Sequence, residues 1–403
     1  MKTILIIGAG REQVAAYERA KEMGLRIIGT DMDKNAPAFQ LSDFQLICST
    51  RDVEKTLCEV IKFSKNHSID GVMTVANDVP YTVARVAEHL GVPGIDSKIA
   101  YLTSNKILMK NKFIDKKVAT PDFYVCETYN DFISNLENIK FPAILKPSDG
   151  RGSRGVFYLE KGINLKWAWE NSLSNSENKK MLLEKYIVGP QLSVEGLVIN
   201  SKFHPIAFAD RNYDNMEQTK PYIVEDGGCI PSKFDDKILD NIALIMDKAA
   251  MALGINWGPF KGDIVLSKNG PIIIEIAARL SGNYLATHHI PFAYGVDLVG
   301  AMIKLSLNIP IELTTIRPKY KKFLGVRYFF PPIGKIKDIV GIEIIRQKNY
   351  LRYLDVYLKP GDFQKDITNH TGRAGTIICE SDTYQGAIEN VEKAVKSIKF
   401  IIE

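Results

Sequence analysis

Short apolar segments alternate with helical patterns through the first 95 residues, and this alternation restricts the possible folds more than any other feature. The apolar segments read KTILIIG, LRIIGTD, FQLICS and GVMTV, and the helical patterns lie near residues 13–23, 53–65 and 79–90. Strands that alternate with helices pair in parallel, with helices on both faces of the sheet. Residues 1–95 therefore predict a parallel α/β domain.

The first strand ends in Gly8-Ala9-Gly10, which is similar to the start of the dinucleotide fingerprint of a Rossmann-like domain. The third glycine is missing because position 13 is Gln, while Asp31 stands where a ribose-binding acid would follow the second strand. A nicotinamide-dependent oxidoreductase is therefore one open alternative. The other is a turn whose glycines let a backbone amide approach an anion at a helix N-terminus.

The rest of the chain changes character twice. Strands and helices resume after a helical region that ends near residue 117, and they become an antiparallel meander after residue 180. From about residue 315, short strands precede a helix at 385–399, which predicts a third, smaller α+β domain with an antiparallel sheet.

The composition excludes several classes of protein. The net charge of +5 is spread along 403 residues without a basic block, so no nucleic-acid partner is expected. The five cysteines show no CxxC spacing, which is typical of reduced thiols. No segment approaches twenty apolar residues, so we expect a cytoplasmic protein without a membrane contact.

Residues 260–282, FKGDIVLSKNGPIIIEIAARLSG, contain two apolar strands joined by a turn at Ser267–Pro271. A hairpin of this length sets Asp263 and Glu275 side by side on one face of a sheet. Paired carboxylates repel unless a cation lies between them, and a few hard oxygen ligands suit Mg²⁺. Arg279 follows with a planar fork for a carboxylate or phosphate. The alternative is a solvated hairpin with surface charges.

Two further segments carry polar chemistry. In residues 143–155, AILKPSDGRGSRG, a strand delivers Lys146 to a loop whose glycines let backbone amides approach phosphates, with Ser153 as a further donor. In residues 181–195, MLLEKYIVGPQLSVE, a strand ends before Gly189-Pro190 and leaves backbone groups free to pair with an adenine edge. Taken alone, each is also an ordinary surface loop.

The order of these segments, with Lys106 before them and the acidic hairpin after them, resembles the ATP-grasp superfamily. The resemblance is to its carboxylate–amine ligases and to its biotin-carboxylase-like and phosphoribosylglycinamide-synthetase-like members. It covers essentially the whole chain, because RAGTIICESDTYQGAIENVEKA, at residues 373–394, is similar to the C-terminal domain of these enzymes.

The resemblance implies three units. These are a Rossmann-like pre-ATP-grasp domain at residues 1–95, a two-lobed ATP-grasp domain at 96–314 and a C-terminal α+β domain at 315–403. Within the second unit, the glycine-rich lid lobe would cover about 118–188 and the metal-binding lobe about 189–314.

The resemblance also implies site roles. ATP would be bound by Lys106, Lys146, Ser153, Glu184, Lys185, Ile187 and Gln191, and the metal by Asp263 and Glu275. Arg279 would be the catalytic group that steadies the acyl phosphate and the attacked carboxylate. Gln191 stands where a glutamate usually binds the ribose, and Ala277 replaces the asparagine that is normally a third metal ligand. The number of metal ions is therefore left open. His288 and Arg327 are candidate substrate contacts.

The implied activity is that of an ATP-dependent ligase, which joins a carboxylate to an amine through an acyl phosphate and releases ADP and phosphate. Amino-acid ligation is the candidate reaction, with ATP and Mg²⁺ or Mn²⁺ as cofactors. The expected partners are a small-molecule carboxylate and amine, and a homodimer is the candidate assembly. Phosphoribosylamine–glycine ligase of purine biosynthesis is the alternative: Gly10-Arg11-Glu12 resembles its GGREH, but Leu280-Ser281-Gly282 replaces its GDPE.

Overall fold

The computed structural model describes all 403 residues. Residues near the N-terminus form a parallel sheet of strand order β3-β2-β1-β4. The strands are β1 (Thr3–Ile7), β2 (Arg26–Asp31), β3 (Phe44–Ile47) and β4 (Gly71–Met73). The helices are η1 (Arg11–Gln13), α1 (Val14–Glu22), η2 (Pro37–Leu41), α2 (Val53–Ser64) and α3 (Pro80–Leu90). Every residue of β1 is buried, as expected for a central strand covered on both faces. The predicted parallel α/β arrangement is confirmed.

Two short helices lead out of this sheet, α4 (Ser97–Ser104) and α5 (Lys106–Asp115). Each begins at a side-chain cap, because the carboxylate of Asp96 and the amide oxygen of Asn105 accept backbone N–H bonds from the first turn. The cap at Asn105 fixes where α5 begins, and so places Lys106 at its first position.

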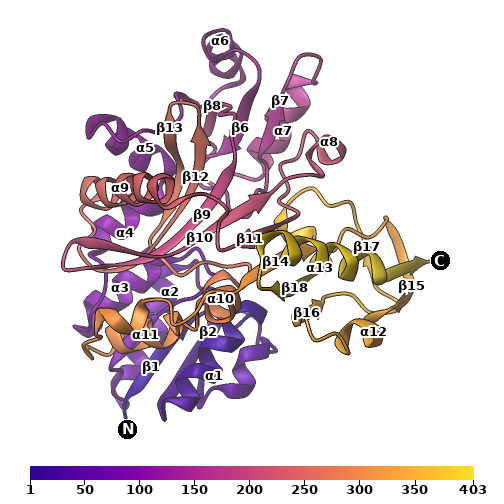
Figure 1. Cartoon of the computed structure of the whole chain (residues 1–403). Coiled ribbons are helices and arrows are strands. Elements are labelled where there is room, and N and C mark those ends of the chain that lie inside the picture. Colours follow the sequence, from indigo (N-terminus) through magenta and orange to yellow (C-terminus); the bar gives the residue numbers. More distant parts are fainter.

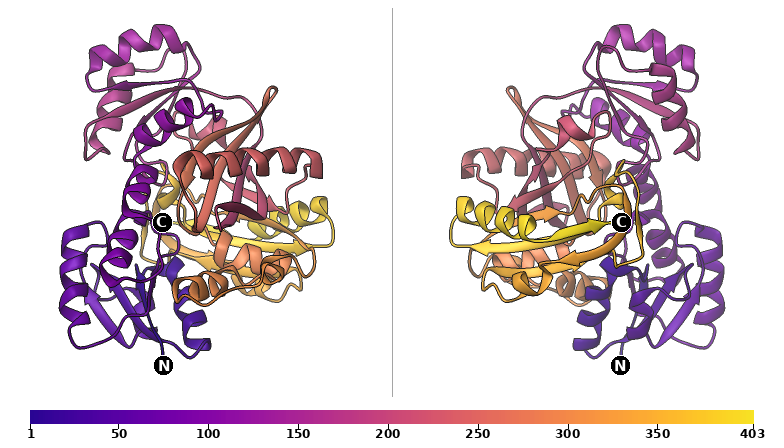
Figure 2. Two further views of the ribbon diagram at one scale, coloured as in Figure 1. Left: turned by 90° about the vertical axis from the view of Figure 1, so that its left-hand side faces the viewer. Right: turned by 90° about the vertical axis from the view of Figure 1, so that its right-hand side faces the viewer.

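A four-stranded antiparallel sheet of order β5-β8-β6-β7 stands at the opposite end of the molecule from the parallel sheet (Figures 1 and 2). Its elements are β5 (Phe123–Cys126), α6 (Tyr129–Ile139), β6 (Ala143–Pro147), β7 (Phe157–Leu159), α7 (Leu165–Ser174) and β8 (Met181–Lys185). The core between the sheet and its helices includes Phe132 stacked on Trp169, with ring centroids 5.6 Å apart. The loop of residues 148–156 joins β6 to β7; we call it the lid.

The largest sheet has eight strands in the order β13-β12-β9-β10-β11-β14-β18-β16. They are β9 (Gln191–Ile199), β10 (Lys202–Asn212), β11 (Gly227–Ile230), β12 (Gly258–Ser267), β13 (Gly270–Ala277), β14 (Phe323–Tyr328), β16 (Leu351–Val356) and β18 (Gly375–Ser381). Helix α9 (Asp236–Leu253) packs on it through Met246 and its neighbours. The sheet continues across residue 315, because β11 pairs with β14.

The remaining elements surround this sheet. A small antiparallel sheet contains β15 (Gly334–Val340), β17 (Phe363–Gln364) and β19 (Lys399–Ile402). The helices are α8 (Met216–Thr219), η3 (Leu285–His289), α10 (Ile290–Tyr294), α11 (Leu298–Ser306), η4 (Leu313–Ile316), α12 (Ile342–Arg346), η5 (His370–Gly372) and α13 (Tyr384–Ser397). The mixed α/β and α+β class is confirmed, and the domain boundaries stay a prediction. None of the helices combines the length and apolar character needed to span a bilayer.

Candidate functional site

A cavity of about 650 Å³ lies between the lid, the eight-stranded sheet and the carboxyl edge of the parallel sheet. This size suits a nucleotide-sized ligand. The cavity is lined by ten of the residues predicted to act: Lys106, Lys146, Ser153, Glu184, Lys185, Ile187, Gln191, Asp263, Glu275 and Arg279. These residues come from separate parts of the chain, so the fold brings the predicted motifs to one place.

Two lysines, Lys106 and Lys146, line the cavity, and a third, Lys110, is fully buried behind them. Lys106 and Lys110 lie one turn apart on α5, and Lys146 comes from β6. The ammonium groups of Lys110 and Lys146 lie 3.1 and 2.9 Å from the same carboxylate oxygen of Glu184. Burial lowers the pKa of Lys110 to about 8, and the Glu184 carboxylate opposes this shift. Lys106 donates to the carbonyl of Gly150 in the lid at 2.7 Å.

The end of β8 and the residues that follow it, Glu184 to Ile187, line the cavity. The Glu184 carboxylate forms ion pairs with the two buried lysines, Lys110 and Lys146. The backbone N–H groups of Lys185 and Tyr186 donate to the carbonyls of Asp122 and Pro142. The N–H of Ile187 has no backbone partner, and Gln191 begins β9 beside it on the cavity wall.

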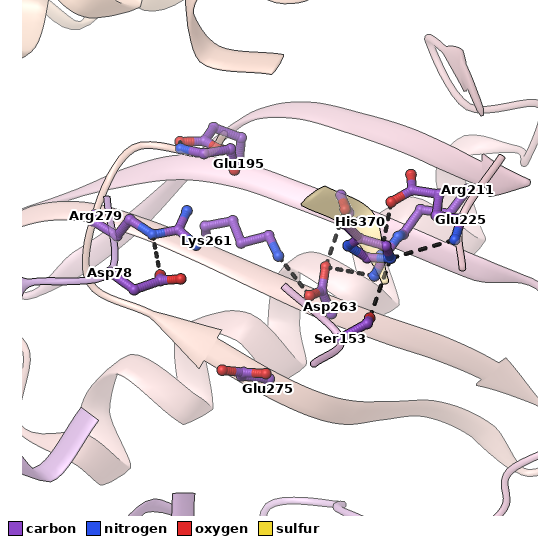
Figure 3. A network of polar contacts seen from close by, with 12 residues as sticks. Asp78, Ser153, Glu195, Arg211, Glu225, Lys261, Asp263, Glu275, Arg279 and His370 are labelled. Carbon is purple, nitrogen blue, oxygen red and sulfur yellow. Dashed lines mark hydrogen bonds and ion pairs between the residues drawn. The ribbon is translucent and has the colours of Figure 1, made fainter. Parts of the chain in front are cut away.

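The hairpin of β12 and β13 places Asp263 directly opposite Glu275, so the predicted proximity of the two carboxylates is confirmed, and a β-bulge between Asp263 and Ile264 produces this register. Asp263 lies 2.6 Å from the ammonium of Lys261 and 3.1 Å from the guanidinium of Arg211. Burial alone would raise the pKa of Asp263, but these two cations hold it well below its usual value. Glu275 lies 2.9 Å from the ammonium of Lys106. Figure 3 shows Lys261 extending between Arg279 and Asp263.

The two carboxylates can hold a metal ion only together with other oxygen donors. No group of three or more His, Cys, Asp or Glu residues is arranged to bind a metal ion. Asp263 and Glu275 both line the cavity, and Ala277 adds no ligand. Because Mg²⁺ keeps waters and phosphate oxygens in its octahedron, this pair fits an ion that arrives with a nucleotide.

Arg279 is held in place from the parallel sheet. Its Nε donates to the carboxylate of Asp78 at 2.5 Å, and one terminal nitrogen donates to the carbonyl of Leu280 at 3.2 Å. Burial alone would raise the pKa of Asp78, but the guanidinium of Arg279, followed by that of Arg151, holds it at about 2. Asp78 is therefore ionised, and the rest of the Arg279 fork faces the cavity.

Glu195 lies behind Arg279 and is completely buried. One of its oxygens accepts the backbone N–H of Ser281 at 3.2 Å, and the other has no partner. Burial raises the pKa of Glu195 to about 7, against the opposing effect of Ser281. Burial therefore favours the protonated form of this carboxyl at a higher pH than for an exposed glutamate.

His288 and Arg327 are not brought to the cavity. His288 packs among aromatic rings, 4.3 Å from Tyr353 between centroids, and burial lowers its pKa to about 4. Arg327 donates to the carboxylate of Glu392 at 2.5 Å. The neighbour of His288, His289, does line the cavity.

Several site residues escaped the sequence analysis, namely Asp78, Lys110, Glu195, Arg211, Lys261 and His370. Two of them carried a usable signal. Lys110 stands four residues after Lys106 on a helix, and Lys261 stands two residues before Asp263 on a strand, so each shares a face with a predicted residue. The others reach the site through long-range contacts that leave no local pattern.

Three family models match the chain. They describe a PylC-like N-terminal domain at residues 4–97, an ATP-grasp domain at 103–283 and an L-amino acid ligase C-terminal domain 2 at 327–403. Together they span most of the sequence in the order that the motifs predict.

Individual relatives are distant but extend along the whole chain. Phosphoribosylamine–glycine ligase of Methanococcus maripaludis is 23% identical over 439 residues, covering 100% of this chain and 93% of the relative. Formate-dependent phosphoribosylglycinamide formyltransferase of Bacillus subtilis is 20% identical and covers 98% of each. The crystal structure of L-amino acid ligase from Bacillus licheniformis superposes with a TM-score of 0.84 at 21% identity, covering 100% and 99% of the two chains. The last comparison shows a shared fold.

Proposed function

This chain belongs to the ATP-grasp superfamily of ATP-dependent ligases, and we propose that it couples two amino acids by activating the carboxylate of one as an acyl phosphate. The observation that carries the proposal is the single cavity that joins two lysines, a glycine-rich lid, paired acids and a fixed arginine. The match of residues 327–403 to an amino-acid ligase domain supports the choice of substrates.

In this proposal, the nucleotide lies between the lid and the hairpin. Lys106 and Lys146 bind the phosphates, and the backbone of Ile187 with the side chain of Gln191 positions the nucleoside. Asp263 and Glu275 hold Mg²⁺ or Mn²⁺, which supplies charge neutralisation for phosphoryl transfer. The buried Glu184 keeps Lys146 oriented toward the phosphates.

Arg279 acts on the carboxylate. A carboxylate oxygen attacks the terminal phosphorus of ATP, its bond to that phosphorus forms, and ADP leaves. The amine nitrogen then attacks the acyl carbon, and the carbon–oxygen bond to phosphate breaks. Phosphate leaves with that oxygen, and a nitrogen proton is released. The guanidinium of Arg279, oriented by Asp78, neutralises the oxygens at which negative charge develops.

Two alternative functions are a phosphoribosylamine–glycine ligase and a nicotinamide-dependent oxidoreductase. A phosphoribosylamine–glycine ligase is favoured by the relative from Methanococcus maripaludis, although Leu280-Ser281-Gly282 replaces the expected GDPE. A nicotinamide enzyme would need Asp31 for a ribose. Asp31 does not line the cavity, and its two oxygens each accept one backbone N–H, from Ala9 and Asp33.

A screen of ADP and phosphate release tests the proposal. The purified chain is incubated with ATP, Mg²⁺ and pairs of amino acids, with glycine plus phosphoribosylamine as a separate arm. Release that needs two amino acids and yields a dipeptide supports the proposal, whereas release only in the phosphoribosylamine arm refutes it. In a parallel melting experiment, ATP with Mg²⁺ should raise the melting temperature and NADH should not. A melting temperature that rises with NADH but not with ATP and Mg²⁺ would refute the binding of a nucleoside triphosphate.

A further inference from the structure

The base of the lid makes several hydrogen bonds to the rest of its lobe, whereas its tip makes few contacts with the residues on the opposite side of the cavity. The base is fixed, because the carboxylate of Asp149 accepts the N–H groups of Glu177 and Asn178 at 2.9 and 2.8 Å. At the tip, Gly152 and Ser153 both have a φ of 61°. A left-handed conformation is unfavourable for serine by roughly 1 kcal/mol or more, so neighbouring contacts have to stabilise it.

Those contacts come from the loop before β18. The backbone N–H of His370 donates to the carbonyl of Gly152 at 3.2 Å. The Oγ of Ser153 lies 3.2 Å from Nε2 of His370. The residues are 217 positions apart, so a segment close to the C-terminus closes the lid over the cavity. Figure 3 shows Ser153 and His370 beside the Asp263 cluster.

The direction of the side-chain bond follows from a third group. The backbone N–H of Glu225 also points to Nε2 of His370, at 3.3 Å. An N–H can only donate, so Nε2 carries no proton, and the Glu225 N–H and the Ser153 hydroxyl share its single lone pair in a bifurcated hydrogen bond. Burial, with the cations Arg373 and Arg211, holds the pKa of His370 well below its usual value, which agrees with a neutral ring.

The same loop is also bonded to Asn283 on another part of the cavity wall. Nε of Arg373 donates to the carbonyl of His370 at 2.8 Å, and another nitrogen of Arg373 donates to Asn283 Oδ1 at 2.6 Å. The N–H of Asn283 in turn donates to the carboxylate of Glu12 at 2.7 Å. His370 is therefore held by Arg373 through contacts that do not involve the lid.

We propose that His370 is a positioning residue, which holds the lid closed by accepting a hydrogen bond from the hydroxyl of Ser153. The consequence for catalysis rests on the proposed function: a closed lid keeps water from the acyl phosphate until the amine attacks. Loss of the bond should let water hydrolyse part of the acyl phosphate, so that more ADP is released for each molecule of product formed.

Limited trypsin digestion tests the bond without any substrate. Arg151 and Arg154 lie in the lid tip, and cleavage after Arg154 gives fragments 1–154 and 155–403 that mass spectrometry identifies. Loss of one hydrogen bond corresponds to roughly fivefold more lid opening. We therefore expect Ser153→Ala and His370→Ala each to speed this cleavage about fivefold, and the double variant to be no faster than His370→Ala.

Two controls separate the bond from general loosening. Ser174→Ala removes an exposed hydroxyl on α7 of the same lobe and should be cleaved like the parent. His370→Gln keeps an acceptor near the position of Nε2 and should restore slow cleavage. Parent rates in both Ser153→Ala and His370→Ala would overturn the proposal, and so would independent, multiplying effects in the double variant.

The ratio of ADP to product is measured with the same variants. If the ratio of ADP to product rises in Ser153→Ala and His370→Ala and has the parent value in His370→Gln, the closed lid protects the acyl phosphate from water as proposed. An unchanged ratio with faster cleavage would overturn that consequence and leave the contact standing. If the ligase reaction itself is not found, the cleavage rates still decide whether His370 holds the lid.

Discussion

Asp78 accepts a hydrogen bond from Nε of Arg279 at 2.5 Å, although 201 residues separate them. Asp78 follows the last strand of the parallel sheet, and Arg279 follows the second strand of the acidic hairpin. The N-terminal unit thus contributes to the reaction site by orienting the residue that we assign to the carboxylate. Ligands bind at the carboxyl ends of parallel strands in many α/β folds, and Asp78 stands at such an end.

Replacing Asp78 with Asn should slow turnover at least about tenfold, which is about 1.4 kcal/mol of transition-state stabilisation. Asparagine keeps an acceptor but removes the charge that fixes the guanidinium. ATP binding, measured by calorimetry, should remain. Glu22→Gln breaks the exposed ion pair with Arg19 and serves as the control. Parent turnover in Asp78→Asn would show that Arg279 needs no partner.

Replacing Glu275 with Gln should reduce ADP release more than about 100-fold, because a carboxylate that we assign to the metal ion is lost. The fold should persist, since the Glu275 side chain is 38% exposed and pairs only with Lys106. Steady-state assays and a melting curve measure both effects. Glu127→Gln, in the exposed pair with Lys180, is the matched control. Undiminished turnover would remove Glu275 from the metal site.

Replacing Glu184 with Gln should destabilise the protein by about 3–5 kcal/mol, because two buried ammonium groups lose their shared carboxylate. Chemical denaturation followed by tryptophan fluorescence measures the loss. Glu160→Gln removes an exposed carboxylate beside Lys220 and should change stability by less than about 1 kcal/mol. Equal stability of the two variants would contradict a buried lysine–glutamate cluster.

Glu195 should make stability depend on pH near neutrality. Its pKa is about 7 in the folded chain against 4.5 for an exposed glutamate, so its carboxyl favours folding at low pH. That contribution is full below about pH 4.5 and is lost as the pH rises through 7. As the pH rises from 4.5 to 8.5, the free energy of unfolding of Glu195→Gln should therefore increase relative to that of the parent by up to about 3 kcal/mol. Melting temperatures of both proteins across this range measure the gap, and a constant gap would contradict the raised pKa.

The sequence predicted those parts of the fold in which neighbouring segments pair with each other. Strict alternation predicted the parallel sheet, and the turn near residues 267–271 predicted the hairpin that brings Asp263 and Glu275 together. The exact pairing of Asp263 with Glu275 also needs a β-bulge between Asp263 and Ile264, which the turn alone does not predict. The pairing of β11 with β14 was not predictable, because edge strands of a meander carry no signal for a partner about 100 residues away. The predicted small C-terminal antiparallel sheet is present as β15, β17 and β19, but β14, β16 and β18 of the same segment belong to the eight-stranded sheet.

The site shows the same limit. Residue types and their order pointed to the phosphate, metal and carboxylate groups, and these residues line one cavity. The residues that orient them were missed when they come from another part of the chain. Asp78 beside Arg279 and His370 beside Ser153 are separated by 201 and 217 residues, and folding alone brings them together. The role of each predicted site residue stays a prediction until it is tested.

The central claim is that a carboxylate is activated by phosphorylation, and an oxygen label tests it directly. The first amino acid is labelled with ¹⁸O in both carboxylate oxygens, and the released phosphate is analysed by mass spectrometry. An acyl phosphate passes one labelled oxygen to each phosphate, because the carbon–oxygen bond breaks when the amine attacks. We predict one ¹⁸O atom in phosphate and none in the nucleotide. Unlabelled phosphate, or label in AMP, would contradict the account.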